Sequence, residues 1–159
     1  MRLFHGSMDQ LAVGTVLRGR GDDYAKAWSS TDFYKVLEQN RPQAYLPHAQ
    51  AVFAVSDPDD IDLAGGGTEW IFELEPTGPV SRHDLNWSSE ISCLLSDGLR
   101  PDSVEVRNAA FNYWAGIPHP NESVWEYLIP EAKIILVEPY EDFQIDSSVF
   151  FQKWNRPKV

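Results

Sequence analysis

Three short stretches of the sequence place chemically capable side chains on segments predicted to be strands. The opening stretch LFHGS holds His5, Gly6 and Ser7, the stretch AVFAVSD holds Phe53, and the stretch VWEYLIP holds Glu126. The Glu126 carboxylate interrupts an otherwise apolar strand, where it is costly to bury unless it faces a cleft or a partner. Gly6 directly follows an ionisable ring, and a residue without Cβ lets the backbone approach a ligand closely. Together these residues indicate a ligand site built from distant strands.

Each of these residues also has a purely structural interpretation. His5 can be a hydrogen-bonded structural histidine, Phe53 a core residue, and Glu126 part of the polar face of an alternating strand. Their order along the chain favours a shared site over three unrelated structural roles.

The sequence lacks the motifs of several other chemistries. The three glycines at 65–67 are not followed by the Lys-Ser of a phosphate-binding loop. There is no HExxH, no paired-cysteine spacing for zinc and no GxSxG of a serine hydrolase. The stretch DPDDID departs from the spacing of an EF-hand loop and is better explained as the start of a helix. We therefore expect no bound metal.

The elements that must position the site alternate between strands and short helices. Strands are expected at 2–4, 13–17, 49–57 and 68–76, and two more in 122–140 on either side of Pro130 and Glu131. Helices are expected at 29–42, capped by Ser30 or Thr31, and at 57–67, 88–98 and 101–116. The stretch 147–157 is expected to be a final strand or a docking tail. This pattern predicts an α+β fold.

Composition bounds the class of protein. The 159 residues, 43% of them hydrophobic, predict one folded domain over 1–159 with a substantial core. Cys93 is the single cysteine, which excludes an intrachain disulfide. No apolar run approaches the roughly 20 residues of a membrane span, and MRLFHGS has no apolar core typical of a secretory signal. A cytoplasmic protein, or one delivered into a host cytosol, is expected.

The net charge of −11 is the clearest indication of which kinds of partner the protein binds. Such a field repels phosphate backbones, so we do not expect a nucleic-acid partner. Basic residues nevertheless collect in the first quarter of the chain, where a local pocket could hold a small anion such as a dinucleotide. They are Arg18, Arg20, Lys26 and Lys35.

The order of the three stretches resembles the ADP-ribosyltransferase superfamily, in the branch similar to diphtheria toxin and the poly-ADP-ribose polymerases. That branch carries His, Tyr and Glu on three strands. FHGSMDQLAVGTVLRGR is similar to the first motif, AVFAVSDPDDI to the second and WEYLIP to the third. FELEPTGPVSRHD is also similar to a stretch of the small rifamycin ADP-ribosyltransferases. The resemblance spans most of residues 3 to 138. It implies a split pair of β-sheets with short flanking helices around a cleft for NAD⁺, the co-substrate.

The resemblance also implies a role for each residue. Glu126 would hydrogen-bond the ribose beside nicotinamide and stabilise the oxocarbenium charge as that bond breaks. His5 would bond the adenosine ribose, the Gly6 backbone would meet the nicotinamide amide, and the Phe53 ring would stack on nicotinamide. Glu126, His5 and Phe53 form the expected catalytic set. The expected NAD⁺-binding set is His5, Gly6, Ser7, Arg18, Arg20, Tyr24 and Phe53, with the arginine segment on the pyrophosphate.

Three departures from the family pattern qualify this resemblance. Phe53 stands where the family usually has Tyr, so a hydroxyl is missing that Tyr24 or Tyr45 would have to supply. Val124 stands where arginine-modifying relatives have an acid, which predicts an acceptor other than arginine. Asp84, just after the EPTGP turn, is the second candidate for the catalytic acid.

The segment before the Glu126 strand is the expected acceptor surface. Tyr113, Trp114 and His119 lie there, although Tyr113 and Trp114 could equally be helix core. We therefore predict a mono-ADP-ribosyltransferase of the toxin, effector or phage-modifier kind, acting on a protein or small molecule. The alternative is a non-catalytic, acidic interaction module that keeps the same fold and binds or inhibits a partner protein.

Overall fold

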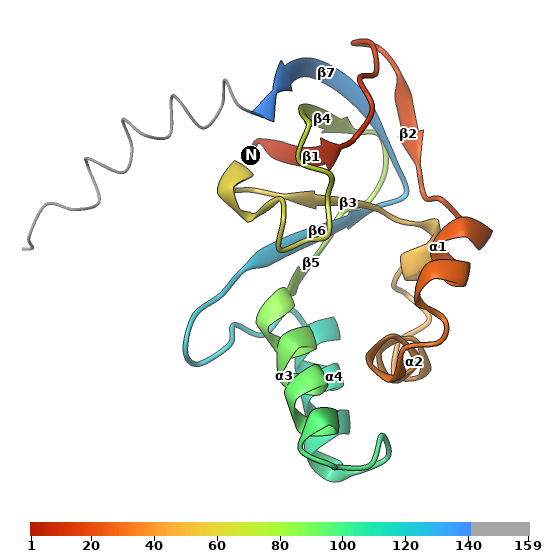
Figure 1. Ribbon diagram of the computed structural model, residues 1–159, viewed down its shortest axis with the longest axis vertical. Coiled ribbons are helices and arrows are strands. Elements are labelled where there is room, and N and C mark those ends of the chain that lie inside the picture. The colour runs from red at the N-terminus through yellow and green to blue at the C-terminus, as the bar shows by residue number, and fades with distance from the viewer. Residues whose placement is uncertain (141–159) are drawn as a thin grey trace, which may run out of the picture.

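Antiparallel strands form a single hydrogen-bonded sheet in a computed structural model, which describes residues 1–140 (Figure 1). The strands are β1 (Leu3–Ser7), β2 (Val16–Arg18), β3 (Val52–Val55), β4 (Trp70–Pro76), β5 (Ser81–Asp84), β6 (Trp125–Ile129) and β7 (Glu131–Pro139). Their order across the sheet is β2-β7-β4-β1-β3-β6-β5, and every neighbouring pair is antiparallel. With the helices described below, this confirms the α+β class.

The sheet is narrowest in its middle, between β1 and β3. Phe4 and Val55 are the one registered pair there, whereas β1 pairs with β4 along its full length from Leu3 to Ser7. The expected pair of sheets is therefore one sheet that splits beyond this pair. One half is β2-β7-β4-β1 and the other is β3-β6-β5. Because β1 and β3 diverge, side chains can enter the gap between them.

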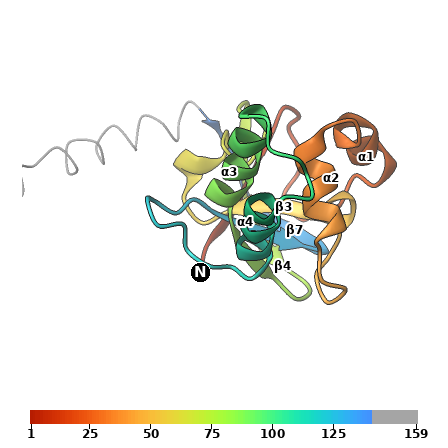
Figure 2. The same cartoon turned by 90° about the horizontal axis from the view of Figure 1, so that it is seen from below.

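Of the four α-helices of the described chain, the first two lie near the ends of β2 and β3 and the last two lie near β5 (Figure 1). They are α1 (Asp22–Trp28), α2 (Asp32–Gln39), α3 (Leu85–Ser96) and α4 (Val104–Trp114), with single 3₁₀ turns η1 (His48–Gln50) and η2 (Pro58–Asp60). Seen from below, α3 and α4 lie side by side, with α1 and α2 next to them (Figure 2). No helix within residues 1–140 is both long and apolar enough to cross a bilayer.

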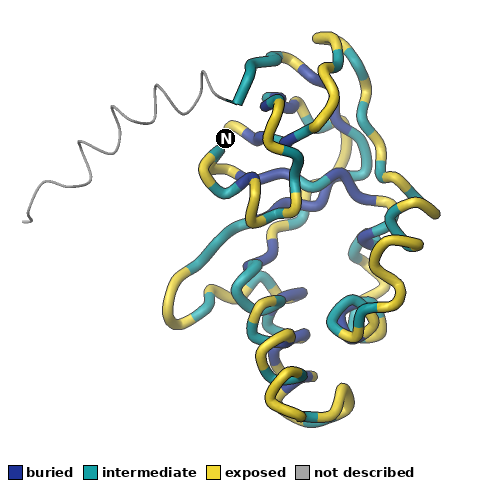
Figure 3. Tube along the Cα trace, viewed as in Figure 1, coloured by how far each residue is buried: buried dark blue, intermediate teal, exposed yellow. Residues whose placement is uncertain are grey.

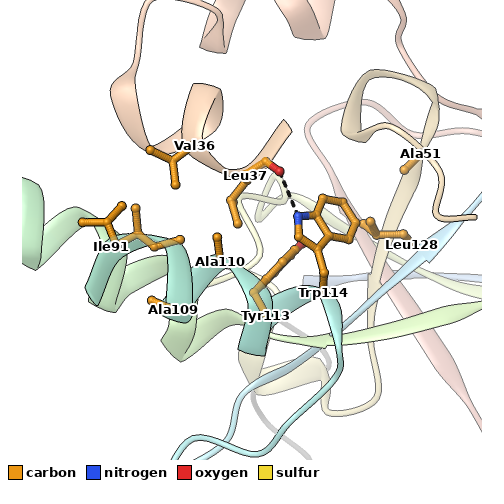
Figure 4. Close-up of a cluster of buried hydrophobic side chains, with 10 residues drawn as sticks. Val36, Leu37, Ala51, Ile91, Ala109, Ala110, Tyr113, Trp114 and Leu128 are labelled. Atoms are coloured by element: carbon orange, nitrogen blue, oxygen red, sulfur yellow. Dashed lines mark hydrogen bonds between the residues drawn. The ribbon is translucent and has the colours of Figure 1, made fainter. Parts of the chain in front are cut away.

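The helices share a core with one face of the β3–β6 pair. Its buried members are Val36, Leu37, Ala51, Ile91, Val106, Ala109, Ala110, Tyr113, Trp114 and Leu128. The Trp114 indole N–H donates to the Leu37 carbonyl at 2.8 Å and so ties α4 to α2 (Figure 4). A second core fills the other face of the sheet, around Leu3, Phe72 and Ile134. Buried positions accordingly follow the central strands and the inner sides of the helices (Figure 3).

Several boundaries differ from the prediction. The helix expected at 57–67 is only the turn η2, in which Asp57 accepts from the Asp59 N–H at 3.0 Å before the chain enters the glycine run. The glycines at 65–67 end that segment because Gly65 has a φ of +73°. Helix α3 begins three positions earlier than expected. The strand β5 and the helix α1 were not predicted, and the stretch 147–157 lies outside the described residues.

Candidate active site

A cavity of about 520 Å³ opens along the split in the sheet. Its walls come from β1, the segment from β2 to α1, β3 and the glycine run at 65–67. It brings together every residue of the predicted NAD⁺-binding set: His5, Gly6, Ser7, Arg18, Arg20, Tyr24 and Phe53. This volume lies within the roughly 300–1,000 Å³ typical of small-molecule sites.

His5 bridges the two halves of the split sheet. Its Nδ1 lies 2.7 Å from the carbonyl oxygen of Phe53 on β3, and its ring lies over Phe72. Because a carbonyl only accepts, Nδ1 carries the proton, and Nε2 of the neutral ring is an acceptor. Burial lowers the pKa of His5, the bond to Phe53 opposes this, and the charge of Arg20 lowers it further. His5 is therefore neutral at pH 7 and suited to accept from a sugar hydroxyl.

Gly6 makes room for the glycine run that forms one wall. A Cβ at Gly6 would lie 2.2 Å from the Gly67 carbonyl oxygen and 2.3 Å from Cγ2 of Ile61. The sequence predicted a close approach of a ligand to Gly6, and in the structure the close approach is made by the chain's own backbone. Gly6 and Gly67 themselves add no side chain to this wall, which Ile61 and Met8 also line.

An aromatic pair forms the opposite wall. Tyr24 of α1 stacks on Phe53 with ring centroids 5.2 Å apart and planes 23° apart. Burial and the nearby charge of Glu126 raise the pKa of Tyr24, so its hydroxyl stays protonated. Tyr45, the other candidate for the missing hydroxyl, packs instead against Trp114. Tyr24 is therefore the tyrosine that the fold brings to Phe53.

The two arginines of the cavity differ in their surroundings. Arg18 pairs with Glu131 across the β2–β7 ladder at 2.5 Å and is largely exposed. Arg20 lies between β2 and α1, where its charge lowers the pKa of His5 and opposes the rise in the pKa of Tyr24. Of the two arginines, Arg20 is thus the one whose charge acts on other side chains that line the cavity.

Glu126 lies behind the cavity wall rather than in it. It is 3% exposed and sits opposite Val55 of β3, whose side of the ladder also carries Phe53. Burial raises the pKa of Glu126, and this is opposed by His48 and by the hydrogen bond from Tyr113. The sequence predicted this residue at a reacting ribose. In the structure its carboxylate is bonded to Tyr113 and does not line the cavity.

A series of hydrogen bonds leads from Glu126 on β6 through α4 and η1 to α2. The Tyr113 hydroxyl donates to Glu126 Oε1 at 2.5 Å and lies 2.8 Å from His48 Nε2. His48 Nδ1 lies 2.5 Å from Glu38 Oε1, and Arg41 Nε donates to the other Glu38 oxygen at 3.1 Å. We call this series, Glu38, His48, Tyr113 and Glu126, the Glu38–Glu126 chain. Sequence reasoning missed Glu38 and His48, because nothing local in the sequence marks either residue.

The carboxylate of Asp84, the second candidate for the catalytic acid, is occupied by hydrogen bonds within the fold. Its buried carboxylate accepts from the backbone N–H groups of Asn86, His119 and Val124 at 3.0, 2.8 and 3.2 Å. It thus caps α3 and fastens the segment that leads into β6. Because its oxygens serve three backbone donors, its place in the structure is explained without a role in chemistry.

The prediction of an acceptor surface is wrong for Tyr113 and Trp114, which form helix core, the alternative that the sequence left open. Tyr113 and Trp114 are 0% and 1% exposed, because both face the core shared by α2, α3 and α4. His119 is half-buried, with its ring 4.6 Å from that of Trp87. Of the three residues, only His119 keeps any contact with the surface.

Within residues 1–140, no three His, Cys, Asp or Glu side chains come together in a way that could hold a metal ion. Comparison with known proteins adds no relative. No protein-family model matches the chain, and no curated protein is significantly similar to it.

Proposed function

We propose that this protein is a mono-ADP-ribosyltransferase that cleaves NAD⁺ and passes ADP-ribose to a protein or small-molecule acceptor in the cytosol. The observation that supports this most is the cavity itself. Residues expected to bind NAD⁺ come from three segments far apart in the sequence, and all of them line one cavity. The acid expected to act on NAD⁺ lies on the neighbouring strand, opposite Val55 and on the same face of the sheet as Phe53.

In this proposal, each wall of the cavity meets one part of the dinucleotide. The neutral His5 accepts from a ribose hydroxyl through Nε2. Arg20 supplies positive charge for the pyrophosphate. The rings of Phe53 and Tyr24 contact the nicotinamide, and the side-chain-free face at Gly6 allows close backbone contact. The acidic protein thus binds an anionic ligand through one local cation.

The chemistry breaks the bond between nicotinamide and ribose. The bonding electrons leave with nicotinamide, which becomes neutral, and positive charge develops on the ribose carbon. An ionised Glu126 would stabilise that charge, as carboxylates do in glycoside cleavage. Glu126 does not line the cavity in the structure, so its approach to the ribose requires a change in the cavity wall. The acceptor nucleophile then bonds to the ribose carbon and loses its proton.

The second candidate is the non-catalytic interaction module. Two observations favour it: Phe53 lacks the hydroxyl of the family's tyrosine, and Glu126 is turned toward Tyr113 and away from the cavity. The two functions differ in NAD⁺ consumption, because only the enzyme releases nicotinamide.

The test is nicotinamide release by the purified protein, with wild type beside E126Q. Glu122 is exposed and precedes the same strand, so E122Q is the matched control. We expect E126Q to lower release by about a hundredfold or more and E122Q to leave it unchanged. Equal nicotinamide release by wild type and E126Q would show that a residue other than Glu126 is the catalytic acid. No release and no NAD⁺ binding, with a cell lysate present as a source of acceptor, would reject the enzyme.

A further inference from the structure

The hydrogen bonds of the Glu38–Glu126 chain fix the position of the proton at its Glu38 end. Glu38 is ionised, because it accepts from the His48 backbone N–H, from His48 Nδ1 and from Arg41. Burial alone would raise the pKa of Glu38, but these bonds together lower it. His48 Nδ1 therefore always carries a proton that it donates to Glu38.

Two arrangements then remain for the rest of the chain. In the first, the Tyr113 hydroxyl donates to the Glu126 carboxylate, so its oxygen accepts from His48 Nε2–H and the imidazole holds two protons. In the second, a protonated Glu126 donates to Tyr113, and Tyr113 donates to a bare Nε2. The two differ only by one proton that moves between His48 and Glu126 across Tyr113. No atom or charge is gained or lost.

We propose that His48 and Tyr113 are positioning residues that hold Glu126 ionised within its apolar surroundings, with Glu38 keeping the shared proton on His48. The geometry favours this arrangement for a simple reason. In the first state, the positive imidazole lies between two carboxylates and is bonded toward both. In the second, the imidazole is neutral, so Glu38 keeps its charge with Arg41 as its one remaining cationic partner in the chain's surroundings, and Glu126 is uncharged.

The other ionisable groups around the chain do not change its charge near neutral pH. They are Tyr24 of α1, Tyr34 of α2, Arg41 after α2 and His83 of β5, which lies opposite Glu126 in the sheet. Burial raises the pKa of each of Tyr24, Tyr34 and Tyr113, so all three stay neutral. Burial lowers the pKa of His83 to about 4, so it is neutral too.

The consequence for the reaction rests on the proposed function. Only the ionised Glu126 can stabilise positive charge on a ribose, yet burial favours its protonated form. The chain offsets that cost from the side away from the cavity, so the face toward NAD⁺ needs no second cation. It also holds the carboxylate in one orientation through the Tyr113 hydroxyl.

The decisive test does not use NAD⁺. The full-length chain, with ¹³C-labelled glutamate carboxyls, is titrated by NMR, and the Glu126 signal is assigned by its loss in E126Q. We expect the midpoint of Glu126 to rise by about one pH unit or more in Y113F and in H48Q. W114F is the matched control, since it removes another buried hydrogen bond of the same core and none of the chain's own, while its ring packs on both His48 and Tyr113.

Folded Y113F with a Glu126 midpoint equal to that of wild type would overturn the proposal. Phe keeps the ring packing of Tyr113, so this variant is expected to fold even if H48Q does not. A midpoint shift of the same size in W114F would also overturn it, because general loosening of the core would then explain the result.

The kinetic test is the pH profile of nicotinamide release. In Y113F we expect the acid limb of kcat to move upward by about one pH unit, with KM for NAD⁺ within about twofold of wild type. An unmoved acid limb would overturn the proposal. If wild type releases no nicotinamide at any pH, the transferase is rejected, and the NMR titration alone decides the role of the chain.

Discussion

Gly6 and His83 show how much of this structure depends on single residues whose role is in packing and hydrogen bonding. Gly6 lies in the cavity wall, and its lack of a side chain lets the glycine run approach β1. His83 lies on β5 against Tyr113 and Trp114, wholly buried, with Nδ1 donating to the Tyr113 carbonyl and Nε2 accepting from the Ser81 hydroxyl. Both residues support the site from within the protein, so changes to them are expected to act through stability as well as binding.

Gly6→Ala is expected to destabilise the protein by about 1–3 kcal/mol and to weaken NAD⁺ binding. The added Cβ meets backbone at Gly67, which cannot move without shifting a wall of the cavity. Gly78→Ala is the matched control, because its Cβ would meet only the ring of Pro130 at 2.9 Å. Urea unfolding and calorimetric titration with NAD⁺ measure the two effects. Equal stability of G6A and wild type would show that the glycine run at 65–67 can move to accommodate the added Cβ.

His83 makes the protein less stable in mild acid. Burial lowers its pKa to about 4, the bond to Tyr113 opposes this, and His48 lowers it further. In the unfolded chain the imidazole takes up its proton near pH 6.5, so only the unfolded state gains a proton between pH 6.5 and about 4. We expect the free energy of unfolding to fall across this window by up to roughly 3 kcal/mol.

The control for this pH dependence is His83→Asn, which retains a donor for the Tyr113 carbonyl. Urea unfolding at several pH values between 4.5 and 6.5 compares it with wild type. The slope of stability against pH should flatten in the variant. An unchanged slope would assign the acid sensitivity to other groups, His5 first among them, since burial also lowers its pKa.

Residues with a local motif were the ones that could be predicted. His5 and Gly6 stand together in one stretch, and Phe53 and Glu126 stand in apolar strands, so each carries a signal in its neighbours. Glu38 and His48 carry none, since a glutamate on a helix and a histidine after a proline are ordinary residues. Their pairing exists only because α2 packs against η1, and no spacing in the sequence encodes that contact.

Among the elements, those with strong hydrophobic patterns were found and those without were missed. The apolar runs of β4, β6 and β7 and the turn at Pro130 are where the sequence placed them. The strand β5 reads SRHD, which has no apolar alternation, and it forms because β6 offers it an edge. The helix α1 buries none of its residues, so it has no apolar face to detect.

The start of α3 depends on one carboxylate. Asp84→Ala removes the cap and leaves three backbone N–H groups without their acceptor, which should cost about 2–4 kcal/mol. Asp102→Ala, on an exposed aspartate paired with Arg100, should leave the urea midpoint almost unchanged. Nicotinamide release per folded molecule should survive in D84A. A hundredfold loss in fully folded D84A would instead make Asp84 the catalytic acid.

The helix α1 brings Tyr24 to the cavity, where its ring stacks on Phe53. Tyr24→Ala removes the ring that stacks on Phe53, so we expect KM for NAD⁺ to rise about tenfold, which corresponds to about 1.4 kcal/mol. Tyr24→Phe keeps the ring and should lower kcat several-fold with KM unchanged. The exposed Lys26→Ala on the same helix is the control. Unchanged kinetics in Y24A would mean that α1 takes no part in binding.

At the scale of the whole molecule, the split sheet predicts that NAD⁺ joins its two halves. The β1–β3 junction has one registered pair and the His5 bridge, so a ligand in the cavity adds contacts to both halves. NAD⁺ at a hundred times its Kd should stabilise the fold by about 2.7 kcal/mol. That corresponds to a rise in Tm of roughly 5–10 °C for a chain of this size.

This measurement is best made on E126Q, in which NAD⁺ is expected to remain intact. It also separates the two candidate functions from a third outcome. A shift in Tm with no nicotinamide release by wild type would favour a module that binds the dinucleotide without cleaving it. No shift in Tm with NAD⁺ would show that the protein does not bind the dinucleotide, so neither candidate function could involve it.

The place of β7 in the sheet has a consequence for how the protein is made. It is the last of the described strands in the sequence, yet it lies between β2 and β4 and pairs with both. While a ribosome is still adding residues before Glu131, β2 has no neighbour and β4 has an open edge. Pairing between such distant segments is slow, so the sheet closes only after β7 has left the ribosome. The cavity wall that β2 contributes would therefore be held in place only after β7 has been made.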